Sequence, residues 1–118
     1  MNNLTTHPEM LNVTKDEDTV TLLLNVTENI SYFQGHFPDA PILAGVVQLD
    51  WAVNYAREHF VLTSAEVEEV QVLKFQNVIV PNSLITLRLI QKSPTKVVFE
   101  YESDKGSHAS GRIVFEGA

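Results

Sequence analysis

The feature that most constrains the fold is one long apolar segment followed by four short segments of alternating polarity. From about Ala44 to Phe60, apolar side chains occupy nearly all sides of a helix, and this segment contains neither glycine nor proline after Gly45. A helix that is apolar all round is a buried helix. Apolar and polar residues then alternate over 66–76, 83–90, 96–102 and 107–116, which is typical of half-buried strands.

One more alternating segment, Thr19–Val26, precedes the helix and predicts another strand. Short joints rich in turn-forming residues separate the later strands and predict antiparallel hairpins at residues 81–83, 92–95 and 104–106. The predicted fold class is therefore α+β, with a curved antiparallel sheet of about five to six strands wrapped around a long central helix. We expect a single domain over residues 1–118, in which residues 1–15 form a loose, polar lead-in.

Composition and charge exclude several classes of function. The formal net charge of −7 and the scattered basic residues disfavour nucleic acid, because phosphate backbones are bound through clusters of Lys and Arg. The absence of cysteine excludes disulfides, thiolate metal sites and thiol nucleophiles. His36 and Asp50 are the only sensible metal-ligand pair, so we expect no metal. Without a secretory signal or a membrane-spanning apolar stretch, we expect a cytoplasmic protein that has no membrane partner.

Three residues within 15 positions point to proton-transfer chemistry beside a carbonyl. His36 stands on a loop punctuated by glycine and proline, where a histidine can act as base or acid. Gly45 opens the apolar helix, where a ligand oxygen can approach bare amides without meeting a Cβ. Asp50 lies inside that helix, where a buried carboxylate must be paired or protonated, and Asn54 stands one turn on to orient it.

Each of these residues also has a plainer interpretation. Gly45 would serve equally well as a flexible joint between the loop and the helix. His36 taken alone is more often a packing or surface histidine, and Asp50 could reach water from a helix edge. His108 stands on a predicted strand, where it could line a pocket, but we expect it to face solvent. The spacing of His36, Gly45 and Asp50 favours the functional interpretation because it combines three complementary groups.

The segment from Tyr32 to Asp50 resembles the active-site segment of the 3-hydroxyacyl-acyl-carrier-protein dehydratases, which are hotdog-fold enzymes. The resemblance is carried by Gly35-His36-Phe37-Pro38, Pro41-Ile42-Leu43 and Gly45-Val46-Val47 together with Leu49-Asp50. Leu73-Lys74-Phe75 and Val80-Pro81 resemble that family's next strand and turn, and the similarity spans roughly residues 15–116. Within the family, residues 46–52 are most similar to the small dehydratases of aryl-polyene biosynthetic clusters.

The resemblance implies dehydration of a 3-hydroxyacyl thioester, carried by acyl carrier protein, to a trans-2-enoyl thioester without a cofactor. It implies that His36 is the catalytic histidine, Asp50 the catalytic acid and Gly45 the amide that holds the thioester carbonyl. Asn54 matches a family glutamine. We expect Phe33, Phe37, Val46 and Trp51 to line the acyl tunnel. The family fold also implies a homodimer whose active sites combine His36 of one subunit with Asp50 of the other.

Two departures from the family pattern bear on carrier recognition and loop order rather than on the catalytic set. Asp39 stands where the family has Gly, and Ala44 where it has Pro. Because the chain is acidic like its expected carrier, Lys92, Lys96 or Arg57 would have to supply a local landing patch. Two alternatives stay open: a hotdog thioesterase that uses Asp50 to activate water, and an acyl-thioester-binding subunit without turnover.

Overall fold

The computed structural model describes residues 4–33 and 41–117 and confirms the α+β prediction. Its elements are β1 (Glu9–Asp16), β2 (Thr19–Val26), the 3-10 helix η1 (Ser31–Phe33), α1 (Gly45–His59), β3 (Val67–Phe75), β4 (Ser83–Ser93), β5 (Lys96–Ser103) and β6 (Gly106–Phe115). Every helix and strand expected from the sequence is present, with its ends shifted by three residues at most.

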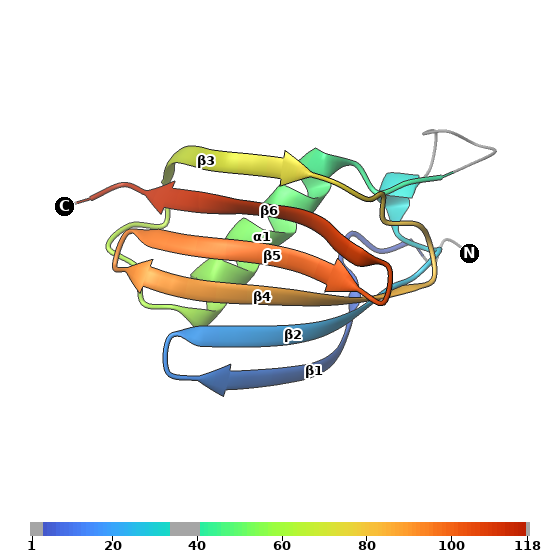
Figure 1. Cartoon of the computed structure of the whole chain (residues 1–118), viewed down its shortest axis with the longest axis horizontal. Helices are drawn as coiled ribbons and strands as arrows, with labels where there is room; N and C mark the ends of the chain where they lie inside the picture. Colours follow the sequence, from blue (N-terminus) through green and yellow to red (C-terminus); the bar gives the residue numbers. More distant parts are fainter. Residues whose placement is uncertain (1–3, 34–40, 118) are drawn as a thin grey trace.

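The strands form one antiparallel sheet in the order β1-β2-β4-β5-β6-β3 (Figure 1). The turns joining β4 to β5 and β5 to β6 are hairpins, as predicted. The expected hairpin at residues 81–83 is wrong, because β3 pairs with β6 at the sheet edge while β4 lies between β2 and β5. The connection from β3 to β4 crosses from the sheet edge to the middle of the sheet. It is held at the end of β2, because Asn82 N donates to Val26 O at 2.6 Å.

The predicted loose lead-in is also wrong, because residues 9–16 form β1 and pair with β2. Every residue of β1 is exposed, so its sequence lacks the alternation that marks a strand with one buried face. The strand is held by its backbone pairing and by Lys15, whose Nζ donates to the carbonyl of His59 at 3.0 Å. Lys15 thereby caps the C-terminal end of α1.

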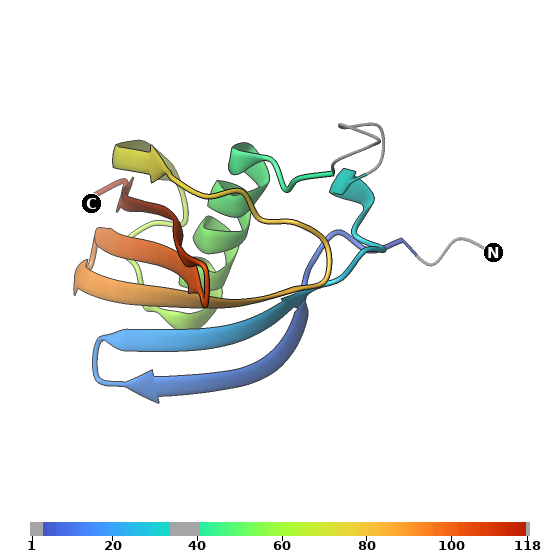
Figure 2. The same ribbon diagram turned by 45° about the vertical axis from the view of Figure 1, so that its right-hand side comes forward.

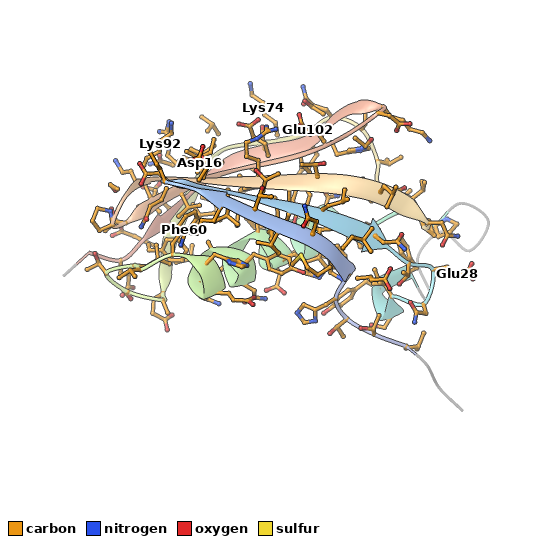
Figure 3. All side chains as sticks on the ribbon, turned by 90° about the horizontal axis from the view of Figure 1, so that it is seen from below. Asp16, Glu28, Phe60, Lys74, Lys92 and Glu102 are labelled. Carbon is orange, nitrogen blue, oxygen red and sulfur yellow. The ribbon has the colours of Figure 1, made fainter. Side chains whose placement is uncertain are left out.

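Helix α1 lies against one face of the curved sheet, and the core fills the space between them (Figure 2). The inward side chains alternate along each central strand: Val20, Leu22, Leu24 and Val26 on β2, Ile85, Leu87 and Leu89 on β4, and Val97, Phe99 and Tyr101 on β5. Figure 3 shows Phe60 on the helix side of the sheet and Lys74 and Glu102 on the other face. Among the residues with described positions, no helix is long and apolar enough to cross a membrane.

Candidate active site

The N-terminal end of α1 is a helix end that no side chain caps. Ala44 precedes the helix in an extended conformation and forms no side-chain cap, and the first turn contains no acidic residue. The approach to the helix is fixed because Leu43 N donates to Ile79 O at 2.8 Å. The first amides of a helix lack intrahelical acceptors and carry the positive end of its dipole. The end that begins at Gly45 is therefore suited to an oxygen that carries negative charge.

Gly45 is in close contact with the ring of Phe75 at the end of β3. A Cβ placed on Gly45 would lie 2.6 Å from Cζ of that ring and 2.8 Å from Cε1. Phe75 is 51% exposed and belongs to Leu73-Lys74-Phe75, the segment that resembles the family's next strand. The structure thus adds a packing reason for the glycine to the expected role in ligand access.

Asp50 is exposed on the outer side of α1, so its predicted burial is wrong for the single chain. Helix α1 packs against the sheet through one face, which holds Trp51, Ala52 and Ala56. The other side is bare, and Val46 one turn before Asp50 is 73% exposed. The apolar residues around the helix therefore led to the wrong expectation, because some of them lie on a surface that stays exposed among the described residues, 4–33 and 41–117.

A chain of three polar side chains runs along the bare side of α1 from the expected catalytic acid. Nδ2 of Asn54 donates to Oδ2 of Asp50 at 3.2 Å, as the one-turn spacing predicts. Nη1 of Arg57 donates to Oδ1 of Asn54 at 3.2 Å, and Nε of Arg57 donates to the carbonyl of Ala65 at 2.8 Å. The sequence interpretation recognised the step from Asn54 to Asp50 but missed that Arg57 continues it.

The buried face of the same helix contacts Tyr101 of β5 and holds Gln48, two residues before Asp50. The Tyr101 hydroxyl donates to the backbone carbonyl of Gln48 at 2.6 Å. Burial raises the pKa of Tyr101 well above its usual range, and the charges of Tyr55 and Asp50 add to this effect. Tyr101 therefore remains a hydrogen-bond donor at neutral pH. Nε2 of Gln48 donates to the carbonyl of Leu43 at 3.1 Å, which ties the helix to the segment before it.

The expected substrate-binding residues lie in different environments. Val46 and Asn54 share the bare side of α1 with Asp50, whereas Phe33 on η1 and Trp51 are buried in the core. The indole Nε1 of Trp51 donates to the carbonyl of Thr6 at 3.0 Å. His36 and Phe37 lie outside the described residues, as does Asp39. The structure thus brings together the helix-borne part of the predicted site.

His108 is buried, so the expectation that it faces solvent is wrong. Its Nδ1 lies 3.1 Å from the carbonyl oxygen of Val78, and its Nε2 lies 2.6 Å from the hydroxyl of Ser103. Because a carbonyl only accepts, Nδ1 is the donor, while Nε2 forms the hydrogen bond with the Ser103 hydroxyl. His108 therefore fastens the β3–β4 connection to the β5–β6 hairpin.

A cavity of about 940 Å³ beside His108 is lined by neither Gly45 nor Asp50. Leu23 and Thr86 line it, and they alternate with the inward residues of β2 and β4, so the cavity opens on the face away from α1. We therefore place the candidate active site at α1 rather than in this cavity. No cluster of three or more His, Asp or Glu side chains suited to a metal occurs within residues 4–33 and 41–117.

The three cations expected to supply a landing patch all lie toward the end of the sheet where α1 ends. Arg57 is engaged with Asn54 and Ala65. Lys92 lies at the same end of the sheet as Phe60, where α1 ends, whereas α1 begins at the other end (Figure 3). Lys96 begins β5 beside the same β4–β5 turn. Within one chain, the two lysines are therefore remote from Gly45.

Comparison with known sequences finds dehydratases. The model of the ApeI-like family, described as ApeI dehydratase, matches residues 12–112. The 3-hydroxyacyl-[acyl-carrier-protein] dehydratase FabZ of Streptococcus pneumoniae serotype 4 is 30% identical over 112 residues, covering 84% of this chain and 78% of that enzyme. The FabZ of Polynucleobacter asymbioticus is 52% identical over only 33 residues, which are 28% of this chain and 22% of that enzyme.

Comparison with solved structures finds the same architecture. The dehydratase heterocomplex ApeI:P from Xenorhabdus doucetiae contains a chain that matches with a TM-score of 0.80 at 24% identity, covering 91% of this chain and 96% of that one. An uncharacterized protein from Erwinia carotovora subsp. atroseptica matches with a TM-score of 0.72 at 33% identity, covering 93% of this chain and 96% of that one. The first match confirms the predicted hotdog fold.

Proposed function

Because this chain belongs to the ApeI-like dehydratase family, we propose that it removes water reversibly from a 3-hydroxyacyl thioester bound to acyl carrier protein. The product is a trans-2-enoyl thioester. The FabZ relatives support the same reaction class, in fatty-acid or aryl-polyene biosynthesis. The observation that carries the proposal is the family match over residues 12–112, which includes the uncapped helix end at Gly45 and the carboxyl group of Asp50.

In the proposed mechanism each group has one task. His36 takes a proton from C2 of the substrate. The amide at Gly45, together with the helix dipole, stabilises the negative charge that develops on the thioester oxygen. Asp50 protonates the departing 3-hydroxyl group, directly or through a water molecule. Val46, on the same side of α1 as Asp50, lines the path of the acyl chain, as do Phe33 and Phe37.

A homodimer with shared active sites is part of the proposal, and the exposed surface of the chain supports it. Strand β3 is the last strand of the sheet, so within the described part of the chain one of its edges has no neighbouring strand. Val72 is 65% exposed on that strand, and Phe75 and Val46 continue the apolar surface onto α1. An unpaired strand edge beside exposed apolar side chains is suited to pairing with a second copy. Such pairing would cover the side of α1 that is bare in one chain.

The function is tested with carrier-bound 3-hydroxyacyl substrates of graded length and unsaturation. We expect the absorbance of the enoyl thioester to appear, and His36→Ala and Asp50→Asn to lower the rate by about 10²–10⁴-fold. Release of free thiol without enoyl product would indicate a thioesterase instead. Acyl binding without any conversion would indicate a binding subunit.

Shared sites are tested by mixing the two inactive variants. A mixed dimer contains one intact site only if His36 and Asp50 come from different subunits. Random mixing makes half of the dimers mixed, so about a quarter of the wild-type activity should return. Sites built within one chain would recover none. The solved ApeI:P relative is a heterocomplex, so the wild-type chain should also be examined for dimer formation without another protein.

A further inference from the structure

We propose that Arg57 is a positioning residue that orients the carboxyl group of Asp50 through the side-chain amide of Asn54. This inference rests on the proposed function, because it assigns Arg57 a part in the step that Asp50 performs. It gives Arg57 a task different from the carrier-landing role expected from its charge.

The three side chains follow one another along the bare side of α1. Asn54 stands four residues after Asp50, and Arg57 stands three residues after Asn54, which are the spacings at which helical side chains meet. The structure shows both contacts, each at 3.2 Å between the hydrogen-bonding atoms. The connection from Arg57 to Asp50 is therefore continuous.

The chemistry of the guanidinium group decides which way the amide of Asn54 points. A guanidinium group has only donors, so it can pair only with the amide oxygen. That pairing leaves the amide nitrogen to face Asp50, where it donates to Oδ2. If the amide were turned by half a rotation, its nitrogen would face the cation and its oxygen would face the carboxylate. Arg57 therefore disfavours the reversed orientation at one end of the amide, and the carboxylate of Asp50 disfavours it at the other.

Arg57 can hold this orientation because its own position is fixed. Its Nε donates to the carbonyl of Ala65, in the segment that leads from α1 to β3. That segment is itself held, since Thr63 N donates to Pro94 O at 3.0 Å and Glu116 N donates to Glu66 O at 2.9 Å. The guanidinium thus connects α1 to a backbone framework shared with β6 and the β4–β5 turn.

The consequence for catalysis concerns the two oxygens of Asp50. The amide of Asn54 occupies Oδ2, and within the described part of the chain no partner is recorded for Oδ1. Oδ1 is then the oxygen that is available to carry a proton to the leaving hydroxyl. Without Arg57, the amide can turn and accept the O–H of protonated Asp50 with its oxygen, so a smaller fraction of molecules would hold the carboxyl group in the productive orientation.

The experiment measures kcat and KM for wild type, Arg57→Met, Asn54→Ala and the double variant. Each is assayed on a carrier-bound 3-hydroxyacyl substrate and on the same acyl group as an N-acetylcysteamine thioester. We expect Arg57→Met to lower kcat about tenfold on both substrates while leaving KM within about twofold. Because Arg57 acts through Asn54, the double variant should be no slower than Asn54→Ala alone.

Arg112→Met is the matched control, because Arg112 is also exposed and also donates to a side-chain amide oxygen, that of Gln71 at 3.4 Å. It should leave kcat unchanged. Arg57→Lys keeps a side chain that only donates, but a single ammonium group cannot reach the carbonyl of Ala65 and the amide of Asn54 together, so it should recover only part of the lost kcat. The side-chain amide protons of Asn54 should also change their NMR shifts in Arg57→Met, which tests the contact without turnover.

Three results would overturn the proposal. An unchanged kcat in a folded Arg57→Met protein would remove the positioning role. A further loss in the Asn54→Ala background would show that Arg57 acts by another route. A raised KM for the carrier-bound substrate alone would assign Arg57 to carrier docking. In all three cases the wild type turns over, so the proposed function stands. A wild type inactive on every 3-hydroxyacyl thioester would instead refute the proposed function, and this inference with it.

Discussion

The contact between Gly45 and Phe75 makes the effect of Gly45→Ala predictable from two opposing contributions. Gly45 does not have a positive φ, so alanine can adopt its backbone conformation without strain. At such a position, Gly→Ala usually stabilises by about 0.4–1 kcal/mol, because the unfolded chain loses freedom. The new Cβ, however, would lie 2.6 Å from the Phe75 ring, whereas ordinary contacts begin at 3.4 Å. The ring must therefore move by about 0.8 Å.

Overpacking of this kind costs about 1–3 kcal/mol in a rigid core. Phe75 is half exposed on an edge strand and meets the Cβ with the far end of its side chain, which places the cost near the lower limit. A cost of about 1 kcal/mol less the gain of about 0.4–1 kcal/mol leaves a net destabilisation of about 0–0.6 kcal/mol for Gly45→Ala. In a Phe75→Leu background the ring atoms are absent, so the same change should become neutral or stabilising.

The assay is urea unfolding of the four proteins of this double-mutant cycle at one protein concentration. We expect a coupling free energy of about 1 kcal/mol between the two positions. A coupling free energy below about 0.3 kcal/mol would refute the packing explanation, since the Phe75 ring would then move aside without a measurable loss of stability. Dehydratase activity separates the two roles of the glycine. If the Cβ also obstructs the thioester oxygen, Gly45→Ala should lower kcat in both backgrounds.

Two further expectations concern stability. Val72 has a φ of 47° at an irregular point of β3, so Val72→Asn should raise the free energy of unfolding by about 1 kcal/mol in urea titrations; no gain would show that the backbone is unstrained there. Burial, followed by the charge of Glu58, raises the pKa of Tyr55 to about 12 from 10.0. Unfolding therefore releases a proton between these pH values, so stability falls as the pH rises through them. Tyr55→Phe should reduce this slope, and an identical slope would contradict the assignment.

Alternation along the sequence was sufficient to predict strands that have one face in the core. Strands β2, β4 and β5 bury alternate residues against α1, whereas β6 also buries His108 and Val114 from its other face. The sequence pattern failed for β1, whose residues are exposed on both faces. It also could not show that β3 pairs with β6, because this pairing depends on where the β3–β4 connection runs, and long-range backbone contacts such as that of Asn82 fix its path.

The candidate site was predictable where spacing along one helix determines contact. Asp50 and Asn54 meet because they are four residues apart. The contact of Arg57 with Ala65 was not predictable, since the position of that carbonyl depends on how the chain leaves α1. The exposure of Asp50 was missed for a different reason. An apolar sequence shows that side chains avoid water, but it does not show whether the same chain or a second one covers them.

Trp51 was expected to line the acyl tunnel, yet it is 1% exposed and its indole donates to the carbonyl of Thr6. A core role and a tunnel role predict different effects of Trp51→Phe. A core role predicts a loss of about 2 kcal/mol, from the hydrogen bond and the smaller ring. A tunnel role predicts a changed preference among acyl chain lengths, because a smaller ring would admit longer chains.

We expect the core role to dominate, because the indole ring is already enclosed in the single chain and its only polar atom is already paired. Thermal or urea unfolding should therefore show the loss of stability, while the relative kcat/KM values over graded chain lengths stay within about twofold of wild type. Val46→Ala is the comparison, since Val46 is exposed beside Asp50 and contributes little to the core of one chain. A shifted chain-length preference in Trp51→Phe at unchanged stability would instead place the indole in the tunnel.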